Sequence, residues 1–190
     1  LEQALRYRKY WGRDGKKGGI TVSGGEPMLQ MPFVTELFEL AHRKGVHTTL
    51  DTAGQPYRED AEYQKAFERM VTATDLVMLD LKAMDAQLHR RVTGLDNANI
   101  LAMARKLSDM GKPMWIRHVL VPGLTDGEDD LQQMAAFIQT LQTVERVEIL
   151  PYHTLGLSKW QRLGIDYPLE GVPTPTKEQV AKAEAILNGK

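Results

Sequence analysis

Five short apolar runs recur along the chain, and most gaps between them hold an amphipathic segment long enough to form a helix. Parallel strands need a long crossover, usually helical, so this alternation predicts βα units and a parallel sheet. The predicted strands are 20–22, 46–50, 76–81, 114–121 and 147–150, and the predicted helices are 33–44, 59–71, 99–110, 128–142 and 177–187. Five units cannot close a regular eight-stranded barrel. The fold class is therefore α/β, either an open parallel sheet or a partial (β/α) barrel.

A single domain over residues 1–190 is expected, because a chain of this length with 42% hydrophobic residues can bury a core. A net charge of −1 gives no electrostatic reason to expect nucleic acid as a partner, and no Lys-Arg tract marks a membrane surface. We find no apolar run of membrane-spanning length and no signal-peptide pattern, so we expect a cytoplasmic location. Small molecules or another protein are the expected partners.

The first predicted strand, Ile20–Val22, is expected to be buried and leads into Ser23-Gly24-Gly25-Glu26-Pro27. The paired glycines free the backbone and leave no side chain between it and a ligand. Pro27 ends the strand, and a helical pattern follows. This turn is predicted to bind a small molecule, although strand-to-helix turns also carry glycine for packing alone.

Polar residues also lie on the other predicted strands or directly after them. Ligands of open α/β sheets bind at the carboxyl ends of the strands, so these positions are the candidate site. The candidates are Gly24, Gly25, Glu26, Asp51, Thr52, Asp80, Lys82, Arg117 and His153. Each has a structural alternative: Asp51 and Thr52 could form a helix cap or turn, and His153 could be a polar loop residue.

Charged residues on two of the strands favour function. Asp80 and Lys82 share one face of a strand predicted to be buried, where unpaired charge is costly. Arg117 suits a carboxylate or phosphate, whereas His118 points the opposite way and is expected to be structural. Two carboxylates (Asp51 and Asp80), the Thr52 hydroxyl and nearby carbonyls offer the hard oxygen ligands of Na⁺, K⁺ or Mg²⁺.

Residues 151–175 are rich in proline and glycine, and predict a long ordered loop that Trp160 and Tyr167 hold in place. After this loop, Thr176 and Gln179 have the spacing of a capping box at the start of the last helix.

Together these segments carry a family resemblance. Ser23–Pro27 is similar to the Gly-Gly-Glu motif of radical S-adenosylmethionine (SAM) enzymes, and the later segments resemble successive blocks of the activating enzymes of pyruvate formate-lyase. These blocks are 50–54, 77–82, 115–117 with 121–123, and 150–153 with 155–156, 159–160 and 163–164. The resemblance covers essentially the whole chain in the right order, and its last block is the most specific.

The resemblance implies a radical SAM partial barrel that lacks its first βα unit. It implies that SAM contacts Gly24, Gly25, Glu26, Asp80, Leu81, Lys82 and His153, and that Asp51, Thr52, Met78 and Asp80 surround a monovalent cation. Arg117 would hold the cofactor or the substrate loop. A 4Fe-4S cluster would cleave SAM to a 5′-deoxyadenosyl radical, which abstracts hydrogen from a glycine of pyruvate formate-lyase or a related glycyl-radical enzyme. A flavodoxin-type protein would supply the electron.

One departure from the family is the absence of cysteine, since the family binds its cluster through a CxxxCxxC motif. The chain begins at Leu1 within a helical pattern, so we expect a segment that has lost the cluster-bearing unit and is inactive alone. Two alternative functions stay open. One is a Schiff-base aldolase or lyase with Lys82 as nucleophile. The other is a non-catalytic binding module, whose exposed sheet edge would permit self-association.

Overall fold

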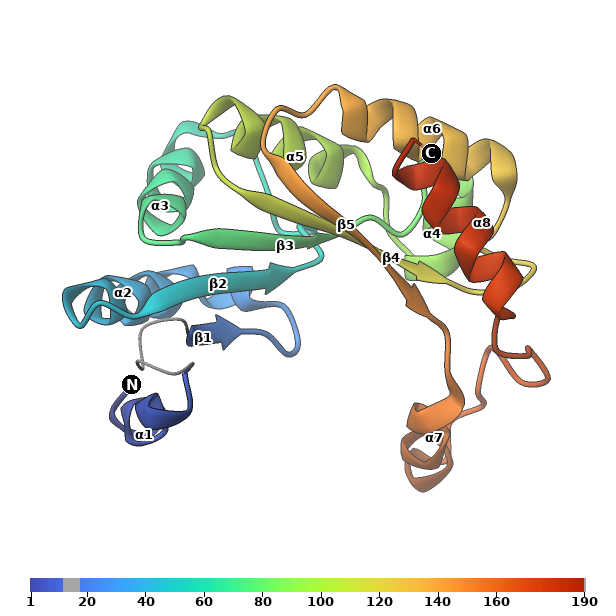
Figure 1. The fold of residues 1–190 in the computed structure, drawn as a ribbon, viewed down its shortest axis with the longest axis horizontal. Coiled ribbons are helices and arrows are strands. Elements are labelled where there is room, and N and C mark those ends of the chain that lie inside the picture. The colour runs from blue at the N-terminus through green and yellow to red at the C-terminus, as the bar shows by residue number, and fades with distance from the viewer. Residues whose placement is uncertain (12–17, 190) are drawn as a thin grey trace. The chain divides into compact units, whose positions relative to one another are not determined.

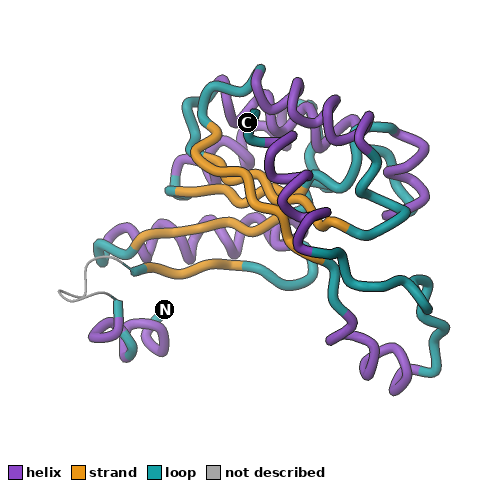
Figure 2. Tube along the Cα trace, turned by 45° about the vertical axis from the view of Figure 1, so that its right-hand side comes forward, coloured by secondary structure: helices purple, strands orange, loops and turns teal. Residues whose placement is uncertain are grey.

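The computed structural model describes residues 1–11 and 18–189, which form an α/β fold with a five-stranded sheet in the order β1-β2-β3-β4-β5. The strands are β1 (Gly19–Val22), β2 (His47–Thr52), β3 (Leu76–Asp80), β4 (Met114–Leu120) and β5 (Val144–Pro151). They are parallel, and helices connect them along the chain (Figures 1 and 2). The predicted fold class and all five predicted strands are confirmed.

The helices follow the predicted alternation closely. They are α1 (Glu2–Arg6), α2 (Met31–Arg43), α3 (Ala61–Thr72), α4 (Ala86–Thr93), α5 (Ala98–Asp109), α6 (Glu128–Gln139), α7 (Leu157–Leu163) and α8 (Lys177–Leu187). Short 3-10 turns precede α2 and α7, as η2 (Pro27–Gln30) and η3 (Thr154–Gly156), and η1 (Arg8–Tyr10) follows α1. In the described ranges, no helix has the length and apolar character needed to cross a membrane.

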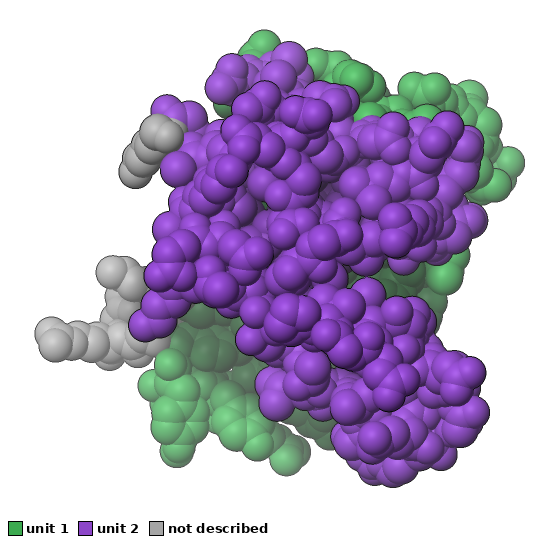
Figure 3. All heavy atoms as spheres, turned by 90° about the vertical axis from the view of Figure 1, so that its right-hand side faces the viewer, with its two compact units in different colours: residues 1–80, 98–116, 141–146 green, residues 81–97, 117–140, 147–190 purple. Residues whose placement is uncertain are grey.

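The chain divides into two compact units (Figure 3). Unit 1 comprises residues 1–80, 98–116 and 141–146, and unit 2 comprises residues 81–97, 117–140 and 147–190. The expectation of a single domain stays a prediction.

The core of unit 1 forms where α2 and α3 pack beside the first strands. One face of α2 buries Met31, Val34, Phe38 and Ala41, which recur three to four residues apart as on one side of a helix. The Asp60 carboxylate caps α3 by accepting a bond from the Tyr63 N–H at 3.0 Å. Removing these apolar side chains from water is the main favourable contribution to the stability of the unit.

In unit 2, α6 and α8 pack together. Leu131 and Met134 of α6 and Ala183 and Leu187 of α8 are buried. The predicted capping box is present, because the Thr176 hydroxyl accepts from Gln179 N and the Gln179 side chain accepts from Thr176 N. This reciprocal pair fixes the first turn of α8.

Two predictions about local structure are wrong. Ile20–Val22 is not a buried strand, because β1 stands at one end of the sheet order and its residues are half-buried or exposed. Residues 151–175 are not only a loop, because α7 forms within them. The predicted packing of the aromatic side chains in this segment is confirmed: the Trp160 and Tyr167 rings meet edge to face, with their centroids 5.6 Å apart.

The loop before β3 holds a half-buried polar cluster in unit 1. Asp75 accepts from the Thr48 N–H at 2.8 Å and contacts the His42 ring nitrogen at 3.1 Å. Burial alone would raise the pKa of the Asp75 carboxyl, but the bonds from Thr48 and His42 outweigh it and lower the pKa below its ordinary value. The ionised carboxylate therefore stabilises the fold.

We expect Asp75→Ala to lower the free energy of unfolding at pH 7 by about 1–3 kcal/mol, because buried Thr48 loses an acceptor. The folded-state pKa is depressed, so this contribution is complete above the ordinary value near pH 3.9 and is lost as pH falls through the folded-state pKa. Urea unfolding at several pH values measures the difference between wild type and variant. Asp166→Ala, at an exposed position, is the control and should change stability little at any pH. A difference independent of pH would contradict this account.

Candidate functional site

The glycine turn after β1 presents bare backbone at the surface of unit 1. Gly24 has φ of 87° and Gly25 has φ of 55°, a left-handed conformation that favours glycine. A Cβ atom added at either glycine would meet no other atom within 4 Å. No packing contact within the described chain therefore accounts for the missing side chains, and a ligand can approach the peptide groups directly.

Glu26 ties this turn to the end of β2. Its carboxylate accepts from the Thr52 hydroxyl at 2.6 Å, from Ala53 N at 3.0 Å and from Met28 N at 3.0 Å. The last of these bonds caps η2. Because its side chain is already engaged, Glu26 is available to a ligand mainly through its backbone.

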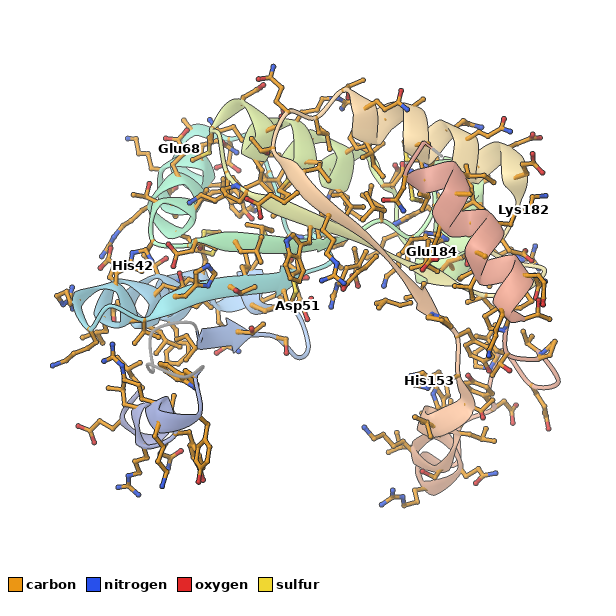
Figure 4. All side chains as sticks on the ribbon, viewed as in Figure 1. His42, Asp51, Glu68, His153, Lys182 and Glu184 are labelled. Atoms are coloured by element: carbon orange, nitrogen blue, oxygen red, sulfur yellow. The ribbon has the colours of Figure 1, made fainter. Side chains whose placement is uncertain are left out.

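Asp51, Met78 and Asp80 share one face of the sheet in unit 1. Asp51 of β2 lies opposite Met78 of β3 in the parallel register, and Asp80 is two residues beyond Met78. Paired residues and residues two apart point to the same face, and all three side chains are half-buried. Figure 4 labels Asp51 towards the carboxyl end of β2. Two carboxylates and a thioether thus line one half-buried stretch of the sheet.

Thr52 points to the opposite face. It is 2% exposed and pairs with Leu79 in the register, and its hydroxyl accepts from Gly54 N at 2.9 Å while it donates to Glu26. Its side chain therefore holds the turn instead of facing the carboxylates. In the described part of the chain, no three His, Cys, Asp or Glu side chains are grouped to hold a metal ion.

An aromatic cluster stands near this turn. Tyr57 and Tyr63 each contact Phe67, at 5.0 and 6.3 Å between ring centroids. The pKa of the Tyr63 hydroxyl is raised to about 12, mainly by burial, with a smaller upward contribution from the negative charge of Glu26 and a downward one from Arg58. At neutral pH Tyr63 is therefore a neutral hydroxyl.

In unit 2, Leu81 and Lys82 follow directly after β3. Leu81 is 2% exposed and its N–H donates to the Arg117 carbonyl at 2.9 Å, whereas the Lys82 side chain is half-exposed. Buried and half-buried residues alternate along β4, so Arg117 lies on the more open face and His118 on the buried one. His118 contacts the Leu81 and Thr125 carbonyls at 2.9 Å, which confirms its structural role.

His153 lies at the surface of unit 2, between β5 and η3 (Figure 4). The preceding Tyr152 is 7% exposed, and its hydroxyl is 2.7 Å from that of Tyr167. This contact fixes the start of the segment, while the His153 ring stays accessible.

The structure thus groups the predicted residues within each unit. Unit 1 brings together the glycine turn, Glu26 and Thr52, and it aligns Asp51, Met78 and Asp80 on one face. Unit 2 joins Leu81 to Arg117 through a backbone bond. Sequence reasoning missed the contacts of Glu26 with Thr52 and Ala53 and the buried side chains Asn97 and Asp130. Only the Glu-Pro pair, typical of a helix start, pointed to the capping role of Glu26.

Comparison with known proteins gives consistent results. The family model described as "Radical SAM superfamily" matches residues 1–138. The pyruvate formate-lyase-activating enzyme of Streptococcus mutans serotype c is 52% identical over 188 residues, which cover 99% of this chain and 70% of that protein. The enzyme of the same name from Staphylococcus aureus (strain USA300) is 49% identical over 190 residues, covering 100% of this chain and 75% of that protein.

Solved structures agree on the fold. The crystal structure of a domain of pyruvate-formate lyase-activating enzyme from Bacteroides vulgatus ATCC 8482 has a TM-score of 0.73 at 25% identity, covering 90% of this chain and 94% of that one. A radical SAM methyltransferase from Sphaerobacter thermophilus has a TM-score of 0.69 at 16% identity, covering 99% of this chain and 53% of that one. The second likeness concerns the fold alone.

Proposed function

Because the chain belongs to the radical SAM superfamily, and within it to the pyruvate formate-lyase-activating enzymes, we propose that it binds SAM at its strand ends to activate a glycyl-radical enzyme. The partner would be pyruvate formate-lyase or a relative. The observation that carries the proposal is the open, left-handed glycine pair after β1. These relatives do not favour the two alternatives, a Schiff-base lyase using Lys82 and a non-catalytic module.

SAM fits the residues of unit 1. The peptide groups of Gly24, Gly25 and Glu26 offer carbonyl and N–H groups to the methionine amino end, with no side chain in the way. Asp80, half-buried at the end of β3, would contact the cofactor from the sheet face.

Residues of unit 2 supply the remaining proposed contacts. Leu81 would contact SAM through its backbone and Lys82 through its ammonium group. Arg117 would pair with a carboxylate of the cofactor or hold the partner's glycine loop, because a guanidinium binds carboxylates in a bidentate manner. His153, exposed beside η3, would hydrogen-bond or stack on the adenosine part.

The 4Fe-4S cluster of the family does not fit the residues of this chain. The family implies such a cluster, which supplies the electron that cleaves SAM, but its ligands are thiolates. The 190 residues contain no cysteine, so no redox step is assigned to them. The role proposed for these residues is to bind and orient SAM and the partner. A flavodoxin-type reductant, a cytoplasmic location and self-association through the edge of β1 also stay predictions.

Calorimetric titration of the chain with SAM tests the binding function. We expect saturable binding of one SAM per chain, and weaker binding of adenosine or methionine alone, because each fills only part of the proposed site. Absence of SAM binding, or equal binding of adenosine, would contradict the proposal.

We further propose a monovalent cation beside the methionine carboxylate, held by Asp51, Asp80 and backbone carbonyls around Thr52 and Met78. The carboxylates of Asp51 and Asp80 on one face of the sheet support this site, because they are hard oxygen ligands. The Thr52 hydroxyl is already hydrogen-bonded, so Thr52 would bind the cation through its backbone carbonyl.

Replacing Asp80 by alanine tests the cation site. We expect SAM affinity to fall by about tenfold more in sodium or potassium buffer than in tetramethylammonium buffer, because the variant loses both a cation ligand and a cofactor contact. Titration calorimetry in the matched buffers provides the comparison, with Asp166→Ala as a control that should behave as wild type in each. Equal losses for Asp80→Ala in all buffers would show that no cation takes part.

A further inference from the structure

The segment Leu81–Asp85, between β3 and α4, lies partly inside unit 2. Leu81 and Ala83 are each 2% exposed, whereas the side chains of Lys82 and Met84 are half-exposed. The backbone is thus buried around a lysine whose side chain faces outward. Loops that only connect elements usually run over the surface, where water satisfies their polar groups.

Three buried polar side chains take the place of water here, and we call Asn97, His118 and Asp130 the polar clamp. The His118 ring Nδ1 lies 2.9 Å from the Leu81 carbonyl. The Asn97 side-chain amide donates to the Ala83 carbonyl at 3.1 Å and to the Met84 carbonyl at 2.8 Å. The carbonyl groups of the residues on both sides of Lys82, Leu81 and Ala83, are therefore held.

Asp130 completes the polar clamp from α6. It is 7% exposed, and its carboxylate accepts from Met84 N at 2.9 Å and from Asp85 N at 2.7 Å. Asp130 lies in the first turn of α6, at the helix end that stabilises negative charge. A buried carboxylate with these bonds resists movement of the loop.

His118 links the loop to the turn after β4. It is 0% exposed, and its Nε2 lies 2.9 Å from the Thr125 carbonyl. Carbonyl oxygens only accept hydrogen bonds, so each bond needs an N–H group of the ring. A neutral imidazole has one N–H and can donate to one of the two carbonyls, whereas an imidazolium has two and can donate to both. The Thr125 hydroxyl donates in turn to the Val119 carbonyl and accepts from Val121 N at 2.8 Å.

We propose that the polar clamp positions Lys82 for SAM, an inference that rests on the proposed function. A lysine side chain loses considerable rotamer entropy on binding, and a backbone that is also mobile would add to that cost. Burying three polar side chains behind one short loop requires their desolvation. In exchange, the backbone that carries the Lys82 side chain is held in one position. Asn97, His118 and Asp130 are thus positioning residues that do not touch the cofactor.

Asp130→Asn tests the inference, with Asp129→Asn as the matched control. Both variants remove one negative charge from the first turn of α6, but Asp129 is exposed. Asparagine at 130 turns one acceptor into a donor that faces the N–H groups of Met84 or Asp85. We expect faster amide hydrogen exchange in 81–85 and about tenfold weaker SAM binding for Asp130→Asn. The control should match wild type in both measurements.

Combining Lys82→Met with Asp130→Asn distinguishes a role of the polar clamp in positioning Lys82 from a general effect of Asp130→Asn on the structure. Lys82→Met should weaken SAM binding in the wild-type background and have little further effect in the Asp130→Asn background, because the ammonium group is then already misplaced. Asn97→Leu, which removes both amide donors without a charge change, should show the same pattern and serves if Asp130→Asn does not fold.

The outcomes are distinguishable. Faster exchange in 81–85 with unchanged SAM affinity, or additive effects of Lys82→Met and Asp130→Asn, would overturn the positioning role and leave the proposed function standing. Unchanged exchange would overturn the polar clamp itself. A wild-type chain that does not bind SAM would defeat the proposed function and the positioning role together.

Discussion

Replacing Gly24 by alanine is expected to weaken SAM binding by about 100-fold, equivalent to about 2.7 kcal/mol, because the new methyl group lies where the cofactor must meet the backbone. Gly24 has φ of 87°, and a Cβ atom there would meet nothing within 4 Å in the described chain. The left-handed backbone adds a folding cost of about 1–2 kcal/mol for alanine. The effect on binding and the effect on stability thus have separate causes.

Gly94→Ala is the matched control for Gly24→Ala. Gly94 ends α4 with φ of 79°, and a Cβ atom there also meets nothing within 4 Å. The two variants should lose similar stability in urea unfolding, but only Gly24→Ala should lose SAM affinity in calorimetry. Equal SAM affinity for both variants would show that the glycine turn does not contact the cofactor.

The strands were predictable because each is a short apolar run between turn residues. β3, for example, keeps Leu76, Val77 and Leu79 buried, and the same residues carry the sequence signal. The last helix was predicted with the correct ends, 177–187, because its capping box is a local pattern. For these elements, the apolar run or the capping pattern in the local sequence was sufficient to predict the secondary structure.

The errors have a common physical origin in contacts that local sequence does not contain. Ile20 and Val22 have the residue types of a buried strand, but burial depends on neighbouring elements, and β1 is at the end of the strand order. Likewise Leu29, Phe33 and Leu40 are apolar, yet they are exposed by 74, 61 and 44%. Helix α7 was missed because none of its residues is buried and glycine and proline surround it.

The candidate site shows the same division. The glycine turn and the carboxylates at strand ends could be found from their positions after apolar runs. The partners of Glu26 could not be found from the sequence, because Thr52 and Ala53 lie at the end of another strand. The face of the sheet on which Thr52 lies also depends on the register of β2 and β3. The structure therefore adds a role for the Glu26 side chain, which holds the turn, while the contact proposed with the cofactor is left to the Glu26 backbone.

Glu26→Ala is expected to lower the free energy of unfolding by about 2–4 kcal/mol, because it leaves three donors without their acceptor. The Thr52 hydroxyl, on a residue 2% exposed, has no ready access to water. Glu26→Gln should cost less, since its carbonyl oxygen still accepts from Thr52, but its amide then faces the Ala53 N–H. Glu36→Ala, at an exposed position of α2, is the control and should change stability by less than about 0.5 kcal/mol.

A double-mutant cycle with Thr52→Val isolates the bond between the two side chains. Valine removes the hydroxyl, so Glu26→Ala leaves one unsatisfied donor fewer in the Thr52→Val background than in wild type. The stability loss of the double variant should therefore be smaller than the sum of the two single losses, by about 1 kcal/mol or more. SAM affinity should fall in each Glu26 variant, because the glycine turn is no longer tied to the end of β2. Additive stability losses would refute the bridging role of Glu26. Full SAM affinity in a folded Glu26→Ala chain would show that the turn keeps its conformation without this carboxylate.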